Sequence, residues 1–249
     1  MRTAAIILIG NELLSGKVVD TNAVWLTGRL RALGVDLRRV VVVPDVEAEI
    51  VDELRRCSAA VDHVFTSGGV GPTHDDITLP GVAAAFGVPI VRNERLAALM
   101  KGHFGARLTE DHLRMADLPA GTELIDGGEI RWPVMKCRNV YVLPGVPEIF
   151  RAKFDAIAER FRDGAFYLRS VYLDADEGTI AARLRALEGD HGVAIGSYPR
   201  IDDADHRLRV TFEARSPAPV DAAVAAFVAA LPPEWIVRVE PPREPPSAG

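Results

Sequence analysis

The chain has 249 residues, of which 48% are hydrophobic and 26% are charged, and its formal net charge is −6. This length allows one large domain or one medium domain with a small companion, and the acidic balance provides no basic excess for nucleic-acid binding. No apolar run approaches the roughly 18 residues of a membrane span, the brief N-terminal run is followed by no cleavage site, and the two cysteines lie far apart. We therefore expect a cytoplasmic protein with reduced thiols and no membrane partner.

The first part of the sequence alternates apolar runs with helical patterns. Residues 4–9 form a continuous apolar run, which is typical of a parallel strand covered on both faces. Similar runs predict strands at residues 39–43, 63–67 and 139–143. Helical patterns cover residues 26–33, 50–61, 78–87, 94–104, 110–116 and 150–161. This alternation favours an open, mostly parallel three-layer α/β/α domain over residues 1–163.

Residues 164–240 have a different pattern, with elements in the order β-α-β-β-α, which is typical of a small α+β domain. Its two helices are rich in alanine and other small apolar residues, so we expect this domain to support association into a homo-oligomer. Its arginines are interleaved with aspartates and glutamates, a mixture that argues against nucleic acid as a partner. The proline-rich tail at residues 241–249 is expected to be disordered.

Four polar loops follow the four predicted strands, at residues 10–22, 44–50, 68–76 and 144–148. The carboxyl ends of parallel strands lie at one edge of an open sheet, where ligands bind in this class of fold. We therefore expect the four loops to form the rim of one ligand site. The last loop begins Pro-Gly-Val-Pro, whose backbone would form the wall opposite the glycines of the third loop.

The loop after the third strand, "SGGVGPTHDDIT", combines glycines with two adjacent carboxylates. Gly68, Gly69 and Gly71 let backbone N–H groups come close to a phosphate, although they would equally serve a tight turn. Asp75 and Asp76 would repel a bound phosphate unless a divalent cation such as Mg²⁺ lay between them. The alternative for this pair is a helix N-cap with a solvated neighbour.

Other charged residues of the rim have competing interpretations. Asp45 follows the second strand and suits either a catalytic role or a cap for the helix that starts near Val46. Asp20 or Thr21 is a candidate N-cap for the helix that contains Leu26, whereas Glu12 has no comparable structural role. Lys17 is the natural cation for a phosphate, although an isolated loop lysine is usually solvated.

Three segments together resemble the molybdopterin-binding-like domain of the CinA (competence/damage-inducible protein) family: "GNELLSGKVVDTNAVWL", "SGGVGPTHDDIT" and "LPGVP". The resemblance covers roughly residues 3–162 and implies the fold shared by MoaB/Mog-type molybdenum-cofactor enzymes and gephyrin. Residues 165–240 resemble the small KH-like domain that follows it in that family. The amidase domain that often ends such proteins is expected to be absent, so nicotinamide-nucleotide deamidation is not implied.

The resemblance implies a metal-dependent nucleotide pyrophosphatase that acts on ADP-ribose or on FAD-like dinucleotides, with Mg²⁺ or another divalent cation as cofactor. The alternatives are a module that binds a nucleotide or molybdopterin without catalysis, and a pterin adenylyltransferase. Catalytic roles fall on Asp76, Asp45 and Glu12, and metal binding on Asp75 and Asp76. The expected substrate-binding residues are Gly10, Asn11, Lys17, Asp20, Asn22, Ser67, Gly68, Gly69, Gly71, Pro72, Thr73, Thr78, Pro144 and Gly145.

The sequence departs from the family pattern in two places. Many members carry Gly-Thr-Ala-Pro-Gly before the last strand, where this chain reads "DGGEIRWPVMKC" at residues 126–137. Many place a glutamate two residues after Leu-Pro-Gly-Val-Pro, where this chain has Ile149 preceded by Glu148. One wall of the pocket is therefore altered. We expect residues 126–137 to set substrate choice, with Trp132 either stacking on a base or flavin ring or packing against the second domain.

Overall fold

The computed structural model describes residues 1–249 apart from 129, 202–204 and 242–249. The chain divides into two compact units, Met1–Asp163 and Gly164–Gly249. All but the first residue of the expected disordered tail at 241–249 lies outside the described residues.

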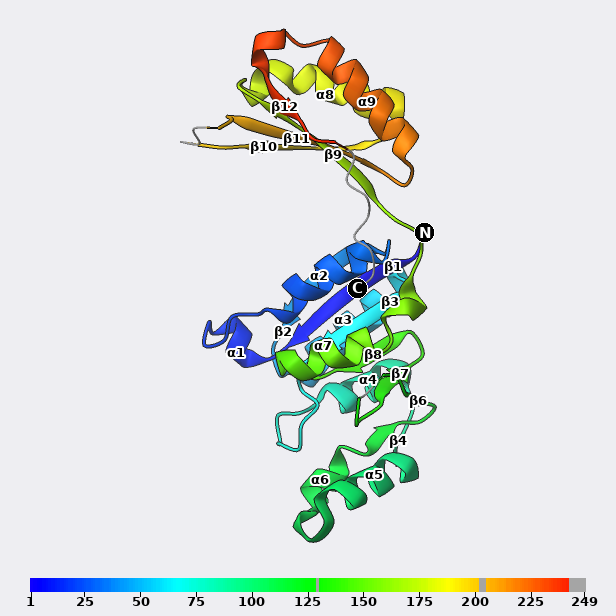
Figure 1. The fold of residues 1–249 in the computed structure, drawn as a ribbon. Helices are drawn as coiled ribbons and strands as arrows, with labels where there is room; N and C mark the ends of the chain where they lie inside the picture. Colours follow the sequence, from blue (N-terminus) through cyan, green and yellow to red (C-terminus); the bar gives the residue numbers. More distant parts are fainter. Residues whose placement is uncertain (129, 202–204, 242–249) are drawn as a thin grey trace. The chain divides into compact units, whose positions relative to one another are not determined.

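The sheet of the first unit has the strand order β2-β1-β3-β8-β7-β6 (Figure 1). Its strands are β1 (Thr3–Ile9), β2 (Asp36–Val43), β3 (His63–Ser67), β6 (Glu123–Ile125), β7 (Val134–Cys137) and β8 (Val140–Leu143). The first three and β8 run parallel, as the apolar runs predicted. The short strands β6 and β7 were not predicted, and they extend the sheet as an antiparallel edge. The chain turns from β7 into β8 at Arg138, which has a φ of 52°.

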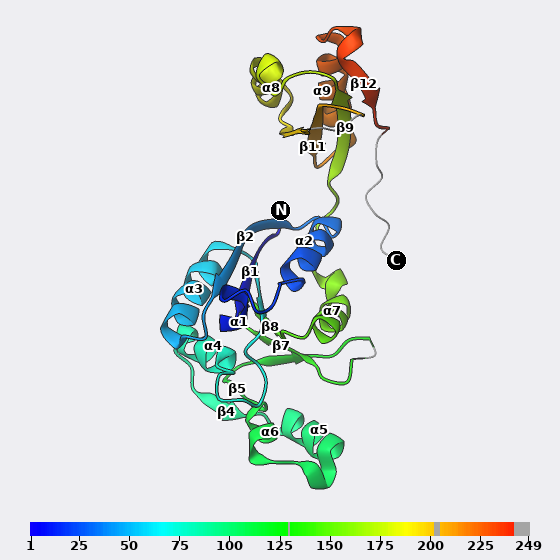
Figure 2. The same ribbon diagram turned by 90° about the vertical axis from the view of Figure 1, so that its left-hand side faces the viewer.

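Helices cover both faces of this sheet and make it a three-layer structure (Figure 2). One face is covered by α2 (Asn22–Ala32) and α7 (Pro147–Asp155), with a short 3₁₀ turn η2 (Ala158–Phe161), and the other by α3 (Glu47–Ala60) and α4 (Thr78–Phe86). The first face buries Phe65 of β3 against Phe150 and Phe154 of α7. The second buries Ile50 and other aliphatic side chains of α3 and α4. Burial of this kind, at roughly 25 cal/mol per Å² of apolar surface, holds the layers together.

A helical hairpin is inserted between α4 and the antiparallel edge of the sheet. It comprises the strand β4 (Ile90–Arg92), the helix α5 (Glu94–Phe104), the 3₁₀ turn η1 (Gly105–Arg107), the helix α6 (Glu110–Arg114) and the strand β5 (Asp117–Pro119). The strands β4 and β5 pair with each other in antiparallel fashion. Asn93 caps α5 by accepting a hydrogen bond from the Leu96 N–H, and a capping box between Thr109 and His112 starts α6.

The second unit is an α+β domain built on an antiparallel sheet, as predicted. Its elements are β9 (Tyr167–Leu173), α8 (Glu177–His191), β10 (Ala194–Pro199), β11 (Leu208–Ala214), α9 (Pro217–Ala229), the 3₁₀ turn η3 (Pro233–Trp235) and β12 (Ile236–Val239). The strand order is β10-β11-β9-β12, so β12 adds a strand that the sequence patterns did not predict. The rings of Phe212 and Phe227, 5.2 Å apart, lie at the centre of its core. Among the helices of the described residues, none is both long and apolar enough to cross a bilayer.

Candidate functional site

The four predicted rim loops do meet at one edge of the first sheet. Because β1, β2, β3 and β8 are parallel, all four strands end at the same edge. Backbone hydrogen bonds join the loops just beyond it. The Gly10 N–H donates to the Val43 carbonyl at 3.1 Å, and the Gly68 N–H donates to the Leu143 carbonyl at 3.3 Å. In Figure 1, the helix α1 (Asn11–Leu14) and the loop before α4 both lie beyond the arrowheads of these strands.

The buried side chain of Asn22 links three of these loops. Its Nδ2 group donates to Ser67 Oγ at 2.9 Å and to the Gly145 carbonyl at 2.8 Å. Its Oδ1 atom is buried without a hydrogen-bond partner among the described residues. Buried amide oxygens are normally satisfied, because leaving one unpaired is unfavourable by about 1–3 kcal/mol. The structure thus brings together three residues that the sequence assigned to substrate binding.

Gly68 is required by the close approach of the loops. It has a φ of +103°, and a Cβ atom at this position would lie 2.2 Å from the carbonyl oxygen of Ile9. Gly145 also lies against it, since its Cβ position would be 3.4 Å from the Gly68 Cα. The Pro-Gly-Val-Pro segment therefore packs directly against the glycine loop, where the sequence had suggested a wall opposite it. Any side chain at residue 68 would force the end of β1 and the loop apart.

The rest of the glycine loop presents free backbone donors. Thr78 holds the loop in place, because its hydroxyl donates to the Gly68 carbonyl at 2.8 Å and its N–H donates to the Gly69 carbonyl at 3.0 Å. The N–H groups of Gly69, Val70 and Gly71 donate to no other described residue. They lie just ahead of the amino end of α4. Free N–H groups beside a helix start form the kind of arrangement that binds phosphates.

Asp76 shapes this loop and does not cap α4. Its Oδ2 atom accepts hydrogen bonds from the Thr73 N–H, at 2.8 Å, and from the Thr73 hydroxyl. The N-cap residue of α4 is Ile77, so the predicted N-cap alternative for the acidic pair is wrong. The helix starts one residue later than a cap at Asp76 would need. The Oδ1 atom of Asp76 makes no hydrogen bond with the described residues. Asp75 is exposed, and hydrogen bonding by the Thr73 side chain lowers its pKa below the ordinary value.

Asp45 and Asp20 both stabilise local backbone. Asp45 Oδ2 accepts from the Asn11 N–H at 2.8 Å, which ties the loop after β2 to the loop after β1. The predicted cap of α3 by Asp45 is wrong, because Val46 is the N-cap residue and no side chain caps it. The N-cap residue of α2 is Thr21, the other candidate, and its side chain makes no capping bond. The Asp20 carboxylate, one residue earlier, accepts from the N–H groups of Asn22, at 3.1 Å, and of Ala23, at 3.0 Å.

The remaining rim residues are solvent-facing. Glu12 lies in the first turn of α1, a short helix that the sequence did not predict, and its carboxylate sits over Gly10. Carboxylates are favoured there by the positive end of the helix. Lys17 and Pro72 are exposed, and Lys17 makes no ion pair with the described residues. Thr73 is also exposed but is fixed by its bonds to Asp76.

The rim does not contain a ready-made metal cage. In the described part of the chain, no group of three or more His, Cys, Asp or Glu side chains is placed to hold a metal ion. Mg²⁺ commonly takes only one or two protein carboxylates and obtains its other ligands from phosphate oxygens and water. The acidic residues of the rim fit that kind of site, in which substrate supplies part of the coordination shell.

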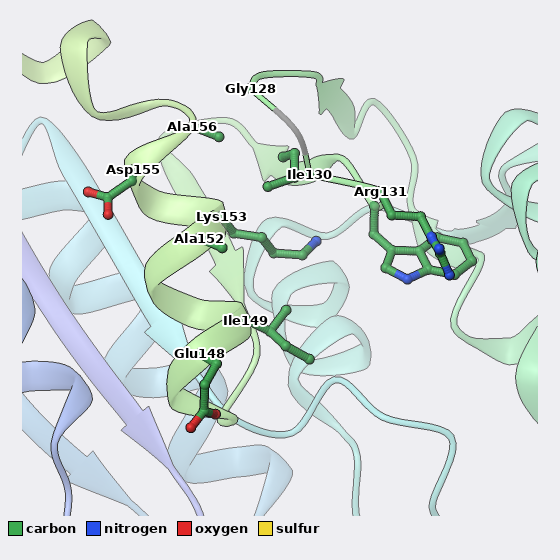
Figure 3. Close-up of a pocket in the computed structure, with 10 residues that line it drawn as sticks. Gly128, Ile130, Arg131, Glu148, Ile149, Ala152, Lys153, Asp155 and Ala156 are labelled. Carbon is green, nitrogen blue, oxygen red and sulfur yellow. The ribbon is translucent and has the colours of Figure 1, made fainter.

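Two adjoining cavities beside the rim were missed by sequence reasoning. The smaller, of about 220 Å³, is lined by Val70 of the glycine loop, by Pro144, and by side chains of α5, β7 and α7. The larger, of about 610 Å³, lies along α7 (Figure 3). Both are lined by Trp132, Ile149 and Lys153. One signal was available: Lys153 lies on the apolar face of its helix, between Phe150 and Phe154.

Trp132 packs inside the first unit. Its ring is stacked with that of Phe104 at 6.4 Å, and it meets His103 edge-on at 5.3 Å. The segment 126–137 that contains it is not one continuous loop, because Val134–Cys137 forms β7. Trp132 is therefore held at the mouth of the cavities by α5 on one side and by the start of β7 on the other.

Comparisons with known proteins agree with these observations. A family model described as "Probable molybdopterin binding domain" matches residues 5–163, and one described as "FAD synthase, middle domain" matches residues 165–240. The second match is to a FAD synthase domain, where the motifs had suggested a KH-like one. A probable FAD synthase from Caenorhabditis elegans is 32% identical over 255 residues, which cover 91% of this chain and 49% of that protein.

Two further relatives carry the CinA name. The CinA-like protein of Myxococcus xanthus is 34% identical, over 87% of this chain and 55% of its own length. The crystal structure of the protein CinA from Thermoplasma acidophilum, described as of unknown function, has 34% identity and a TM-score of 0.60, and covers 64% of this chain and 98% of its own. This chain spans about half the length of the FAD synthases it matches. The chain belongs to the family defined by the probable molybdopterin binding domain, together with CinA-like proteins.

Proposed function

We propose that the first unit hydrolyses the pyrophosphate bridge of a dinucleotide such as ADP-ribose or FAD, with a divalent cation as cofactor. The observation that carries this proposal is the meeting of free N–H groups and carboxylates at one edge of the sheet. Gly69, Val70 and Gly71 provide three unpaired donors, and Asp76 provides a carboxylate oxygen without a partner. The relatives named FAD synthase support a dinucleotide, since FAD contains a pyrophosphate bridge.

The glycine loop would bind the phosphates. Its N–H groups point to an anion because nothing else in the described chain accepts from them. The positive end of α4 adds to this preference. In a chain of net charge −6, such local donors are what allows a doubly charged pyrophosphate to bind at all.

Asp76 and Asp75 would hold the divalent cation, with Glu12 as a further ligand or as the base. A bound cation of this kind neutralises charge that develops on the bridge and lowers the pKa of a water ligand. Asp76 is pre-oriented for this task, because its Oδ2 atom is fixed by Thr73 while its Oδ1 atom is free. Asp45 holds Asn11 and so fixes the position of the short helix that carries Glu12.

The description of the matched family favours one other candidate, a pterin-binding domain. Such a domain would either bind molybdopterin without chemistry or transfer an adenylyl group to it. Asn22 Oδ1 and the free N–H groups would then recognise the pterin and its phosphate. Both forms of this alternative would use the same rim. An adenylyltransferase would differ from a hydrolase in its product, and a binding module would form none.

One experiment separates these functions. The purified chain is incubated with ADP-ribose, FAD or NAD, each with Mg²⁺, Mn²⁺ or Co²⁺, and the products are identified by mass spectrometry. Hydrolysis gives AMP and a second phosphate ester. An adenylylated pterin, formed when ATP and molybdopterin are supplied, identifies an adenylyltransferase. Binding without turnover under all conditions rejects both enzymatic functions and leaves the binding module.

A further inference from the structure

Lys153 is a buried cation without a counter-ion. Its side chain is 7% exposed, and its Nζ group donates a hydrogen bond to the Pro133 carbonyl at 2.7 Å. No carboxylate of the described residues forms an ion pair with it. Burial lowers its pKa from 10.5 to about 8. Burying an ammonium group without a counter-ion is unfavourable. A buried lysine of this kind is therefore a candidate for a functional role.

The lysine lies where two cavities meet. The smaller cavity has walls formed by Val70 and Pro144 of the rim and by the stacked rings of Phe104 and Trp132. In Figure 3 the Lys153 amine extends from α7 toward the side where Arg131 lies. The carboxylates of Glu148 and Asp155 point away from it.

The polar neighbours of Lys153 provide no counter-charge for its ammonium. Arg131 and His103, which line these cavities, are hydrogen-bonded to each other at 2.8 Å. Glu148 and Asp155 line only the larger cavity, and Asp155 forms an ion pair with Arg29 at 2.8 Å. The small cavity thus combines mainly apolar and aromatic walls, with the imidazole of His103 among them, and the desolvated ammonium of Lys153.

We infer that Lys153 is a specificity-determining residue, whose ammonium binds the hydrogen-bond-accepting edge of a flat heteroaromatic ring held against Trp132 and Phe104. The ring would be the base or flavin of the dinucleotide, so this inference rests on the proposed function. Val70 belongs both to the free-donor loop and to the cavity wall, which makes the phosphate and ring subsites contiguous. A phosphate would fit the cavity less well, because it needs several donors, and besides Lys153 the described lining side chains offer only the ring N–H groups of His103 and Trp132.

Direct binding without turnover tests this inference. In the presence of a divalent cation that supports no turnover, titration calorimetry would measure the affinity of the chain for FAD, adenosine, riboflavin and inorganic pyrophosphate. Lys153→Met keeps the apolar stem and removes the charge. It should weaken binding of FAD, and of whichever free ring the wild type binds, by about tenfold or more, because a charged hydrogen bond is lost. Pyrophosphate affinity should not change.

The matched control is Lys101→Met, which removes an exposed lysine from α5. It should bind all four probes like the wild type. Lys153→Gln retains a donor and should recover part of the ring affinity, and it replaces Lys153→Met if that variant does not fold. The inference would be overturned by any of three results. The Lys153 variants could bind the rings as tightly as the wild type, they could lose pyrophosphate affinity to the same extent as ring affinity, or the wild type could bind neither adenosine nor riboflavin. Absence of hydrolysis would reject the proposed function alone, since none of these measurements depends on turnover.

Discussion

Asn22 Nδ2 lies 2.9 Å from Ser67 Oγ, and this hydrogen bond ties the first turn of α2 to the end of β3. The same amide group reaches the Gly145 carbonyl beyond β8. One side chain therefore sets the spacing of three rim loops that are far apart in sequence. Because that side chain is buried and its Oδ1 atom is unpaired, it combines a structural role with a free acceptor at the site.

Replacing Asn22 by alanine should therefore affect both stability and ligand binding. It removes two hydrogen bonds and leaves the Gly145 carbonyl without this donor, so we expect unfolding to become easier by about 1–3 kcal/mol. Turnover, measured well below the melting temperature, should fall by much more than the unfolded fraction explains. Thr27→Ala in the same helix is the control, because it removes only a local bond to the Ala23 carbonyl. Equal activity in the two variants would contradict the role of Asn22 in the site.

Asp76 can be tested with a variant that separates charge from loop structure. Asp76→Asn keeps an oxygen that can accept from the Thr73 N–H, so its stability should stay within about 0.5 kcal/mol of the wild type. It removes the negative charge that a divalent cation needs, so hydrolysis and its dependence on Mg²⁺ should be lost. Activity assays across a Mg²⁺ titration give the answer. A stable Asp76→Asn chain with wild-type turnover would reject the metal role, as would the same result for Asp76→Ala.

The parallel strands and the rim were predictable because each depends on local sequence. Residues 4–9 form an uninterrupted apolar run, and such a run is buried whatever else the chain does. The glycine loop was recognisable for a similar reason. Gly68 adopts a positive φ that other residues avoid. The Ile9 carbonyl oxygen also lies so close to Gly68 that no side chain would fit.

The antiparallel edge and the cavities were not predictable in the same way. The strand β7 has only four residues, "VMKC", and its pairing with β8 depends on tertiary contacts that a local sequence pattern does not show. The cavities depend on α5, whose Phe104 reaches Trp132 from 28 positions away along the chain. The capping alternatives for Asp45 and Asp76 failed because each helix starts one residue later than the cap would need, and each carboxylate accepts from a different backbone N–H.

Two glycine variants should separate close packing from backbone strain. Gly68→Ala combines a φ of +103° with a Cβ position 2.2 Å from the Ile9 carbonyl, so something must move. Gly16→Ala has a φ of +70° but open space around it. We expect Gly16→Ala to be destabilised by about 1–2 kcal/mol and Gly68→Ala by clearly more. Urea denaturation measures both. Equal destabilisation would mean that the contact between β1 and the glycine loop relaxes without penalty.

Trp132→Ala tests whether the altered segment selects the substrate. Loss of the indole removes one wall of the small cavity, so relative rates for FAD, ADP-ribose and NAD should change. Trp132→Phe keeps an aromatic wall and should shift the ratios less. Met115 lines the same cavity without being aromatic, so Met115→Leu is a volume-conserving control that should leave the ratios unchanged. An equal loss of rate for all three dinucleotides after Trp132→Ala would instead indicate that Trp132 only supports α5.

Lys153 should make the stability of the first unit depend on pH in a defined direction. Its pKa is about 8 in the folded chain and near 10.5 when unfolded, so between these values the unfolded chain binds more protons. Stability therefore rises with pH across this window, by about 3 kcal/mol if the lysine is fully desolvated. Lys153→Met lacks this contribution. We expect the variant to be the more stable protein at pH 7 and the difference to narrow toward pH 10.

Urea denaturation of both proteins at pH 7, 8, 9 and 10 would measure this difference. Cys57 and Tyr141 also have pKa values raised by burial, and they would lower stability as they ionise at high pH. Both are retained in the variant, so their effects cancel when the two curves are subtracted. If the difference in unfolding free energy between the two proteins stays constant from pH 7 to pH 10, Lys153 is solvated in the folded chain. The role inferred for Lys153 as a desolvated ammonium would then be wrong.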